Sequence, residues 1–197
     1  MSAPSRPALA TRTAGVRIAR IAADVVEVAA RRGRAAELES LAARDGLALP
    51  ALGTSSAQPA ALALAVRPGR WLVLAEPGAP GAGAARLTAR LSAAATVVDL
   101  GSALVAFRLE GPAHRALLAR GCRLDLDAAV FRAGAVAATP IAQVPVTLAA
   151  LGAGMLLLTP STTARHFAEW LAASAAPFGI DGPAPLPFNR LLGDPGA

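Results

Sequence analysis

Residues 97–126 read VVDLGSALVAFRLEGPAHRALLARGCRLDL, a stretch in which strand, turn and helix signals follow one another. It opens with two apolar runs, residues 97–100 and 103–109, which Gly101 and Ser102 separate. Both runs are rich in Val, Leu or Phe, side chains that suit a pleated, partly buried backbone. The pattern predicts two short strands with a turn or bulge between them.

A helix is expected directly after these strands. Pro112 suits its first turn, because proline lacks the backbone N–H that would find no partner at that position. Leu117 and Leu118 follow at helical spacing, and Gly121 is expected to end the helix as a C-terminal cap. The whole stretch is therefore predicted to form strand, turn, strand and helix.

The N-terminal half of the chain carries a further helix and two further strands. Residues 34–45 place their apolar side chains on one face, which is typical of an amphipathic helix. Residues 61–66 and 71–75 are predicted strands, joined by the turn Arg67-Pro-Gly-Arg70. Trp71 is expected to anchor the core.

Weaker patterns fill the remainder of the chain. The residues after Val16 alternate as a strand does, and a second strand is favoured over a helix at residues 25–29. The glycines of residues 76–83 resemble those of a phosphate-binding loop, but the Gly-Lys-Ser/Thr signature is missing. The other elements expected are a helix at 84–94, a buried hairpin at 141–159, and a helix capped by Ser161 or Thr162 that runs to about residue 175. Strands and helices without strict alternation favour an α+β fold.

The composition describes a chain that can bury a core but is poorly suited to nucleic acid. Of its 197 residues, 54% are hydrophobic and 16% are charged, so wholesale disorder is not expected. The net charge is +6, yet every basic side chain is Arg, and the 4% of aromatic residues leave few platforms for base stacking. We expect no nucleic-acid partner, since a basic face that meets an acidic protein explains the charge equally well.

The sequence favours a cytoplasmic protein that does not span a membrane. The single cysteine, Cys122, rules out an internal disulfide framework and fits a reducing compartment. The N-terminus lacks the apolar core of a signal peptide. Residues 133–164 carry no formal charge, but Pro140 and Pro145 would break a membrane-spanning helix there.

Side chains that could carry catalysis are few. His114 and His166 both fall on predicted helices, and neither has a Cys, Asp or Glu at metal-ligand spacing. Cys122 has no neighbouring His to activate it, so a buried and unreactive thiol is favoured. The sequence therefore predicts no catalytic residue and no metal ligand.

Asp99 is the one weak candidate for a cofactor-binding side chain. It follows two valines at the end of a predicted strand, where a carboxylate could line a pocket. The favoured alternative is that Asp99 accepts backbone N–H groups of the turn near Gly101. Asp125 stands in the same Asp-Leu context further along the chain.

These motifs, in this order, resemble the gamma subunit of heterotetrameric sarcosine oxidase. The phrase VDL…RLEGPA…LLARGC.LDL, within residues 98–126, is similar to the corresponding stretch of that family. Residues 67–74, RPGRWLVL, resemble its "PGEWLLL"-type strand. Val144-Pro-Val146 and the helix containing Trp170 fall where the family has a strand and its last helix. The resemblance covers roughly residues 15–175.

The resemblance implies an α+β fold of two ferredoxin-like lobes, as in the folate-binding aminomethyltransferase-like fold. The organisation then expected is a flexible N-terminal arm at residues 1–13, a single gamma-subunit-like domain at 14–176 with lobes at about 14–95 and 96–176, and an irregular Pro/Gly-rich C-terminal tail at 177–197.

Two departures from related families limit what the resemblance carries over. The gamma family usually has Ser and Arg where this chain has Gly101 and Leu104, which puts any polar contact of that Arg in doubt. Folate-dependent repair proteins of this fold carry a Lys-Gly-Cys-aromatic-x-Gly-Gln-Glu signature. Residues 120–126 match its start but lack the Gln-Glu end.

The resemblance implies a non-catalytic structural subunit with alpha, beta and delta partner subunits. In that family the complex demethylates sarcosine oxidatively to glycine, with hydrogen peroxide and formaldehyde or methylene-tetrahydrofolate, in sarcosine catabolism and one-carbon metabolism. FAD, FMN, NAD, zinc and tetrahydrofolate are implied in the partner subunits and not in this chain. The alternative is a stand-alone folate-binding one-carbon transfer or repair protein of the same fold, in which Asp99 would face the pterin.

Overall fold

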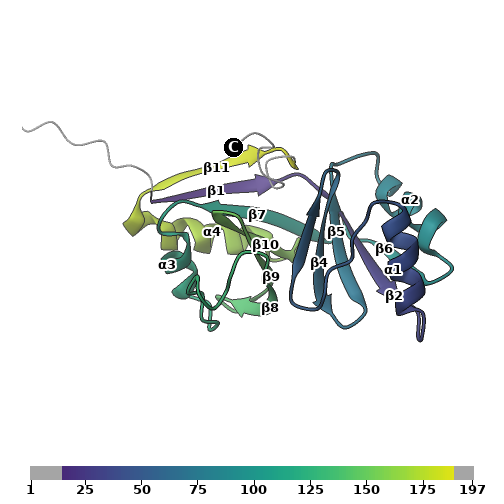
Figure 1. The fold of residues 1–197 in the computed structure, drawn as a ribbon. Coiled ribbons are helices and arrows are strands. Elements are labelled where there is room, and N and C mark those ends of the chain that lie inside the picture. The colour runs from purple at the N-terminus through teal and green to yellow at the C-terminus, as the bar shows by residue number, and fades with distance from the viewer. Residues whose placement is uncertain (1–14, 189–197) are drawn as a thin grey trace, which may run out of the picture.

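The computed structural model describes residues 15–188 as two β-sheets flanked by helices (Figure 1). Within these residues the larger sheet has the strand order β11-β1-β7-β10-β9-β8, and the smaller sheet has the order β3-β4-β5-β2-β6. The strands are β1 (Val16–Ile21), β2 (Asp24–Ala30), β3 (Ser55–Gln58), β4 (Ala61–Arg67), β5 (Arg70–Ala75), β6 (Ala95–Asp99), β7 (Leu104–Glu110), β8 (Val136–Ile141), β9 (Val144–Leu151), β10 (Gly154–Pro160) and β11 (Ile180–Leu186). The helices are α1 (Ala35–Arg44), α2 (Ala82–Leu91), α3 (His114–Ala119), α4 (Ala164–Ala175) and the short 3-10 helix η1 (Ala176–Phe178). The fold is α+β, as predicted.

The smaller sheet is built from the order β2-α1-β4-β5-α2-β6, with β3 added at one edge. The strands β2 and β5 form the central pair, and every pairing in this sheet is antiparallel. This βαββαβ arrangement is that of a ferredoxin-like lobe.

The larger sheet repeats the same frame as β7-α3-β9-β10-α4-β11, with β8 added at one edge. It also takes in β1, which lies between β7 and β11, antiparallel to the first and parallel to the second. The sheets are therefore interleaved along the chain. The path changes sheet between β1 and β2 and again between β6 and β7.

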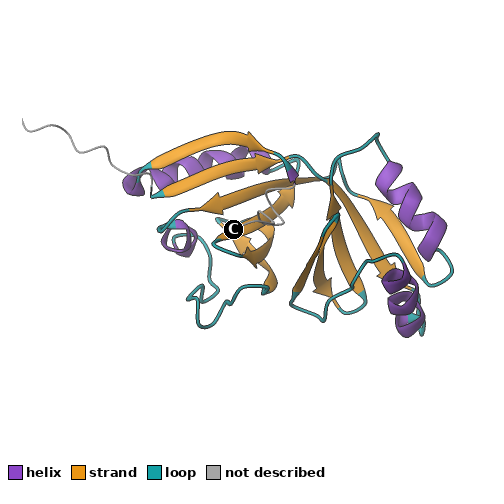
Figure 2. Ribbon diagram, turned by 45° about the horizontal axis from the view of Figure 1, so that its top comes forward, coloured by secondary structure: helices purple, strands orange, loops and turns teal. Residues whose placement is uncertain are grey.

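The strands alternate their side chains between two different apolar layers. Leu72 and Leu74 of β5 share a cluster with Leu156 and Leu158 of β10, and this cluster forms the core between the two sheets. The opposite faces are covered by helices, α1 and α2 on the smaller sheet and α3 and α4 on the larger (Figure 2). A strand whose successive side chains point to opposite faces serves both layers at once.

Trp71 is a core anchor, as the sequence predicted. Its side chain lies on the helix-covered face of the smaller sheet and is 6% exposed. The indole N–H donates a hydrogen bond to the carbonyl oxygen of Pro50 at 2.9 Å. The tryptophan thus fixes the connection after α1 onto the sheet.

The stretch 97–126 has the predicted order of strand, strand and helix, but its two strands do not pair with each other. β6 belongs to the smaller sheet and β7 to the larger one. The turn between them is held by the backbone N–H of Leu100, which donates to the carbonyl of Val25 at 2.8 Å, and by that of Ala103, which donates to Leu100 at 3.0 Å. This stretch therefore carries the chain from one lobe to the other.

Helix α3 ends at Ala119 with Arg120 as its C-cap, so Gly121 follows the helix where a terminating glycine was predicted, although its φ is not positive. The glycine is instead required by a neighbour. A Cβ at this position would lie 2.6 Å from Cζ2 of Trp170 and 3.0 Å from the backbone nitrogen of Ala142. The close approach of α4 to the end of α3 leaves no room for a side chain.

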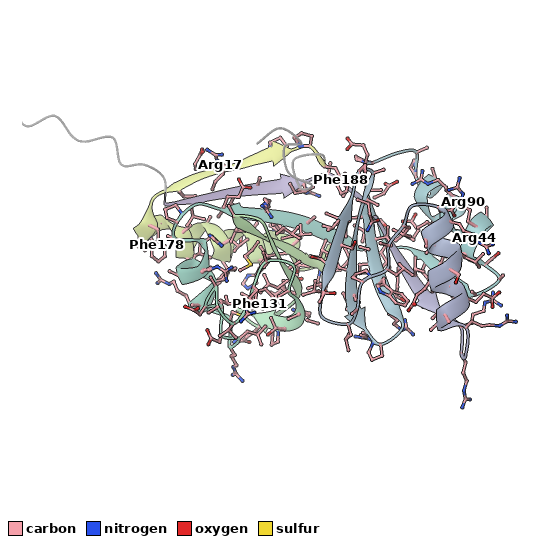
Figure 3. The ribbon with its side chains drawn as sticks, viewed as in Figure 1. Arg17, Arg44, Arg90, Phe131, Phe178 and Phe188 are labelled. Carbon is pink, nitrogen blue, oxygen red and sulfur yellow. The ribbon has the colours of Figure 1, made fainter. Side chains whose placement is uncertain are left out.

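The prediction of an irregular tail from residue 177 is wrong for the part that the structure describes. After η1, strand β11 pairs parallel with β1. Its prolines at 183 and 185 are tolerated because β11 is an edge strand, whose outer side needs no N–H donor. Phe188 is 2% exposed and packs in the core between the sheets, near their junction (Figure 3). The predicted arm at 1–13 and the end of the tail lie outside the described residues.

Two smaller expectations also change. The hairpin expected at 141–159 is the second half of a three-stranded meander, β8-β9-β10. The N-cap of α4 is Thr163 and not Ser161 or Thr162, and its hydroxyl donates to the carbonyl of Pro160 at 3.2 Å.

No helix among residues 15–188 is long and apolar enough to cross a membrane.

Candidate functional site

Asp99 lies at the C-terminal end of β6, where its side chain is exposed. Its Oδ1 accepts the backbone N–H of Gly101 at 2.8 Å. Asp125 does the same in its own turn, since its Oδ1 accepts the N–H of Asp127 at 2.9 Å. The two Asp-Leu motifs therefore both stabilise turns, which is the reading of Asp99 that the sequence favoured.

The two histidines and the cysteine do not form a common site. Cys122 is buried without a disulfide, and His166 is exposed on α4. His114 lies at the start of α3, with Nδ1 2.6 Å from the carbonyl oxygen of Gly111 and Nε2 buried without a partner in the described part of the chain. Among residues 15–188, no three His, Cys, Asp or Glu side chains lie close enough to hold a metal ion.

Burial lowers the pKa of His114 below its ordinary value of 6.5. The hydrogen bond with Gly111 acts in the opposite direction, as does the charge of Glu110, while the nearby charges of Arg115 and Arg108 lower the pKa further. The surroundings of the imidazole therefore favour its neutral form on balance. It does not line any of the three pockets named below.

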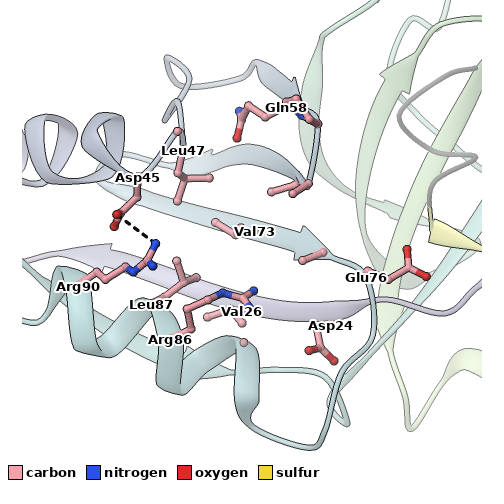
Figure 4. Close-up of a pocket in the computed structure, with 16 residues that line it drawn as sticks. Asp24, Val26, Asp45, Leu47, Gln58, Val73, Glu76, Arg86, Leu87 and Arg90 are labelled. Carbon is pink, nitrogen blue, oxygen red and sulfur yellow. Dashed lines mark ion pairs between the residues drawn. The ribbon is translucent and has the colours of Figure 1, made fainter. Parts of the chain in front are cut away.

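A pocket of about 440 Å³ opens on the helix-covered face of the smaller sheet (Figure 4). It lies between α2 and the segment that follows α1. The floor is formed by Val26 of β2 and Val73 of β5, and Leu47 and Leu87 complete its apolar walls. This volume is within the range of about 300–1,000 Å³ that is usual for small-molecule sites.

Charged side chains of both signs surround the apolar floor of this pocket. Arg90 of α2 pairs with Asp45, which follows α1, at 3.1 Å, as Figure 4 shows. Arg86, one turn earlier on α2, is exposed and has no acidic partner among residues 15–188. At the other end lie Asp24, whose Oδ2 accepts the N–H of Gly78 at 3.3 Å, and the exposed Glu76.

Sequence reasoning missed this pocket because its lining comes from separate segments. They are β2, the segment after α1, the β3–β4 turn, β5 and α2. One signal was visible, since Arg86 and Arg90 stand four residues apart on the predicted helix and flank Leu87. Asp99, the residue that the sequence did single out, lines neither this pocket nor two others, one of about 320 Å³ at the junction of the sheets and one of about 460 Å³ beside β8 and β9.

No family model matches this sequence, and no curated protein matches it either. Comparison with solved structures is more informative. A chain of "Heterotetrameric Sarcosine Oxidase from Corynebacterium sp. U-96 in complex with pyrrole 2-carboxylate" aligns with a TM-score of 0.74 and 25% sequence identity. The alignment covers 85% of this chain and 87% of that one. The chain is similar to sarcosine oxidase. The resemblance predicted from the motifs is thereby confirmed.

A second solved structure supports the fold. It is the glycine cleavage system aminomethyltransferase T from Bartonella henselae, with a TM-score of 0.63 and 20% identity. The alignment covers 86% of this chain but 48% of that protein, so this chain spans about half the length of the transferase. Together the two likenesses place the chain in the folate-binding aminomethyltransferase-like fold.

Proposed function

We propose that this chain is the non-catalytic gamma subunit of a heterotetrameric sarcosine oxidase. The observation that carries the proposal is the extent of the structural match. The alignment with one chain of such an oxidase spans 85% of this chain and 87% of its counterpart, so the two are matched almost end to end. A chance likeness confined to one lobe would not produce an alignment that extends over both lobes.

The environments of the candidate side chains support a structural role. The Asp99 carboxylate accepts a backbone N–H of its own turn, and Nδ1 of His114 lies against the carbonyl oxygen of Gly111. A catalytic acid or base needs a free hydrogen-bonding atom that faces a substrate, whereas the unpartnered Nε2 of His114 is buried. Neither residue lines the pockets described above. The role proposed for this chain is therefore to dock onto catalytic partners.

The proposal extends to the partners, the cofactors and the compartment. The partners are the alpha, beta and delta subunits, and FAD, FMN, NAD, zinc and tetrahydrofolate belong to those subunits. The assembled complex would convert sarcosine to glycine in the cytoplasm. The net charge of +6 suits a subunit that meets acidic surfaces on its neighbours.

Co-purification tests this proposal. The chain is expressed with an affinity tag from its own genomic neighbourhood, and the proteins that elute with it are identified. The expected result is a yellow complex that contains a large folate- and NAD-binding subunit, a flavin-dependent amine oxidase subunit and a small zinc subunit. A colourless protein that elutes alone would overturn the docking role.

The fold also favours one alternative, a stand-alone folate-binding one-carbon transfer or repair protein. Its support is the likeness to aminomethyltransferase T, which concerns the fold alone. Calorimetric titration of the isolated chain with tetrahydrofolate separates the two ideas. Saturable binding by the chain alone favours the alternative, and its absence leaves the subunit role as the proposal.

A further inference from the structure

The pocket on the smaller sheet is open because small residues line it where its helix begins. Gly83 of α2 faces the sheet, and a Cβ there would lie 3.3 Å from Oδ2 of Asp24 and 3.6 Å from Cγ2 of Val26. The Asp24 carboxylate therefore lies against the first turn of α2. Arg86 follows Gly83 by three residues, which places it one turn further along the same face of the helix.

The charges around the pocket favour a ligand that carries both signs. Arg90 and Asp45 neutralise each other, whereas Arg86 has no acidic partner in residues 15–188. Asp24 and Glu76 provide negative charge on the side of Arg86 that faces away from the Arg90–Asp45 pair (Figure 4). A simple anion would meet the two carboxylates, and a simple cation would leave Arg86 unpaired. A ligand that carries both charges on one carbon can satisfy Arg86 and Asp24 together, because Asp24 lies against the helical turn that precedes Arg86.

The volume of the pocket and its apolar floor limit the size and polarity of the ligand's uncharged part. At about 30 Å³ for each atom of water size, 440 Å³ holds about fifteen non-hydrogen atoms. Val73 and Leu87 offer an apolar surface beside these charged groups (Figure 4). The body of the ligand must therefore be apolar and small.

We propose that this pocket binds an amino acid with an apolar side chain. Its carboxylate pairs with Arg86, its ammonium group lies at Asp24, and its side chain covers Val73 and Leu87. The proposal concerns a face of this chain and does not depend on the subunit role. It stands whether the chain purifies alone or in a complex.

Isothermal titration calorimetry of the full-length chain, alone or in the complex with which it purifies, tests the proposal with three matched probes. L-phenylalanine carries both charges, 2-phenylethylamine lacks the carboxylate, and 3-phenylpropanoate lacks the ammonium group. We expect L-phenylalanine to bind roughly tenfold more tightly than either analogue, because each lost charged contact costs about one hydrogen bond to a charged group. Equal binding of the three probes, or no binding of L-phenylalanine, would overturn the proposal.

Two variants test which side chain binds the carboxylate of the ligand and which binds its ammonium group. Arg86→Gln should remove the preference for L-phenylalanine over 2-phenylethylamine, and Asp24→Asn should remove its preference over 3-phenylpropanoate. Asn keeps an oxygen for the N–H of Gly78, so the loop is retained. Arg44→Gln is the control, because Arg44 is exposed on α1 and does not line the pocket (Figure 3). Unchanged preferences in the first two variants, or the same loss in the control, would place any binding elsewhere.

Discussion

The two lobes share one βαββαβ frame but differ in how their helices cover the sheet. On the larger sheet, the ring of Phe167 meets Phe107 edge-on with centroids 6.0 Å apart and stacks on Trp170 at 5.9 Å. On the smaller sheet, Trp71 is the one aromatic side chain of the described cluster, which otherwise consists of Ala, Val and Leu. We call the helix-covered side of the larger sheet the closed face and that of the smaller sheet the open face.

The difference between these faces follows from side-chain size and not from topology. Aromatic rings fill the closed face, whereas the open face retains a pocket of about 440 Å³ between α2 and the segment after α1. Both faces have two helices over a sheet with the same βαββαβ frame. A duplicated frame can thus supply rigidity in one lobe and a ligand-sized space in the other.

The largest effect is expected from removing the ring that closes the larger lobe. Phe167→Ala should lower the free energy of unfolding by about 3–5 kcal/mol, because it deletes a fully buried ring and leaves a cavity. Leu87→Ala, on the open face, should cost about 1 kcal/mol, since Leu87 is half-buried at the pocket. Urea unfolding monitored by circular dichroism measures both. Similar losses in the two variants would contradict the comparison.

A pair of glycines tests the same contrast at smaller magnitude. Gly121→Ala should destabilise the protein by about 1–3 kcal/mol, because the new Cβ would lie 2.6 Å from the Trp170 ring. Gly83→Ala on the open face should change the stability by less than about 1 kcal/mol. There the nearest atom, at 3.3 Å, is a carboxylate oxygen of Asp24, and alanine is the better helix former.

The melting temperatures of both glycine variants check this prediction. Combining Gly121→Ala with Trp170→Leu provides the control, because the smaller side chain frees the space that the Cβ needs. The double variant should lose less than the sum of the two single changes. A large loss in Gly83→Ala, or strict additivity in the double variant, would show that the closed face is not the more tightly packed one.

The sequence predicted the elements whose signals are local. The helix expected at 34–45 is α1, with Leu38 and Ala42 buried on its apolar face. The helix expected to run to about residue 175 is α4, which buries Phe167 and Leu171. Both depend on a 3.6-residue period that needs no knowledge of the remainder of the chain. The family resemblance then supplied the fold that these elements form.

The sequence failed where long-range contacts decide the structure. Strand β11 exists because β1 offers it a parallel partner, although its own prolines and glycine favour irregular structure. Gly121 is required by Trp170, which lies far along the chain. The pocket likewise unites Asp24, Arg86 and other residues that no motif connects. Asp99 was visible only because it sits in a motif, and it proved to be a turn residue.

The smallest effect concerns His114, whose half-buried imidazole packs at the closed face. Burial lowers its pKa below the ordinary 6.5, so below this pH the unfolded chain binds a proton more readily than the folded one. The contribution of His114 to the free energy of unfolding should therefore be fully present above pH 6.5. It should be lost as the pH falls through the lower pKa of the folded state. His114→Gln should flatten this decline, whereas His166→Gln, which changes an exposed histidine on α4, should not. Urea midpoints between pH 5 and 8 measure the slope. If His114→Gln retained the full slope, the closed face would not be excluding water from this imidazole, and the contrast with the open face would rest on packing alone.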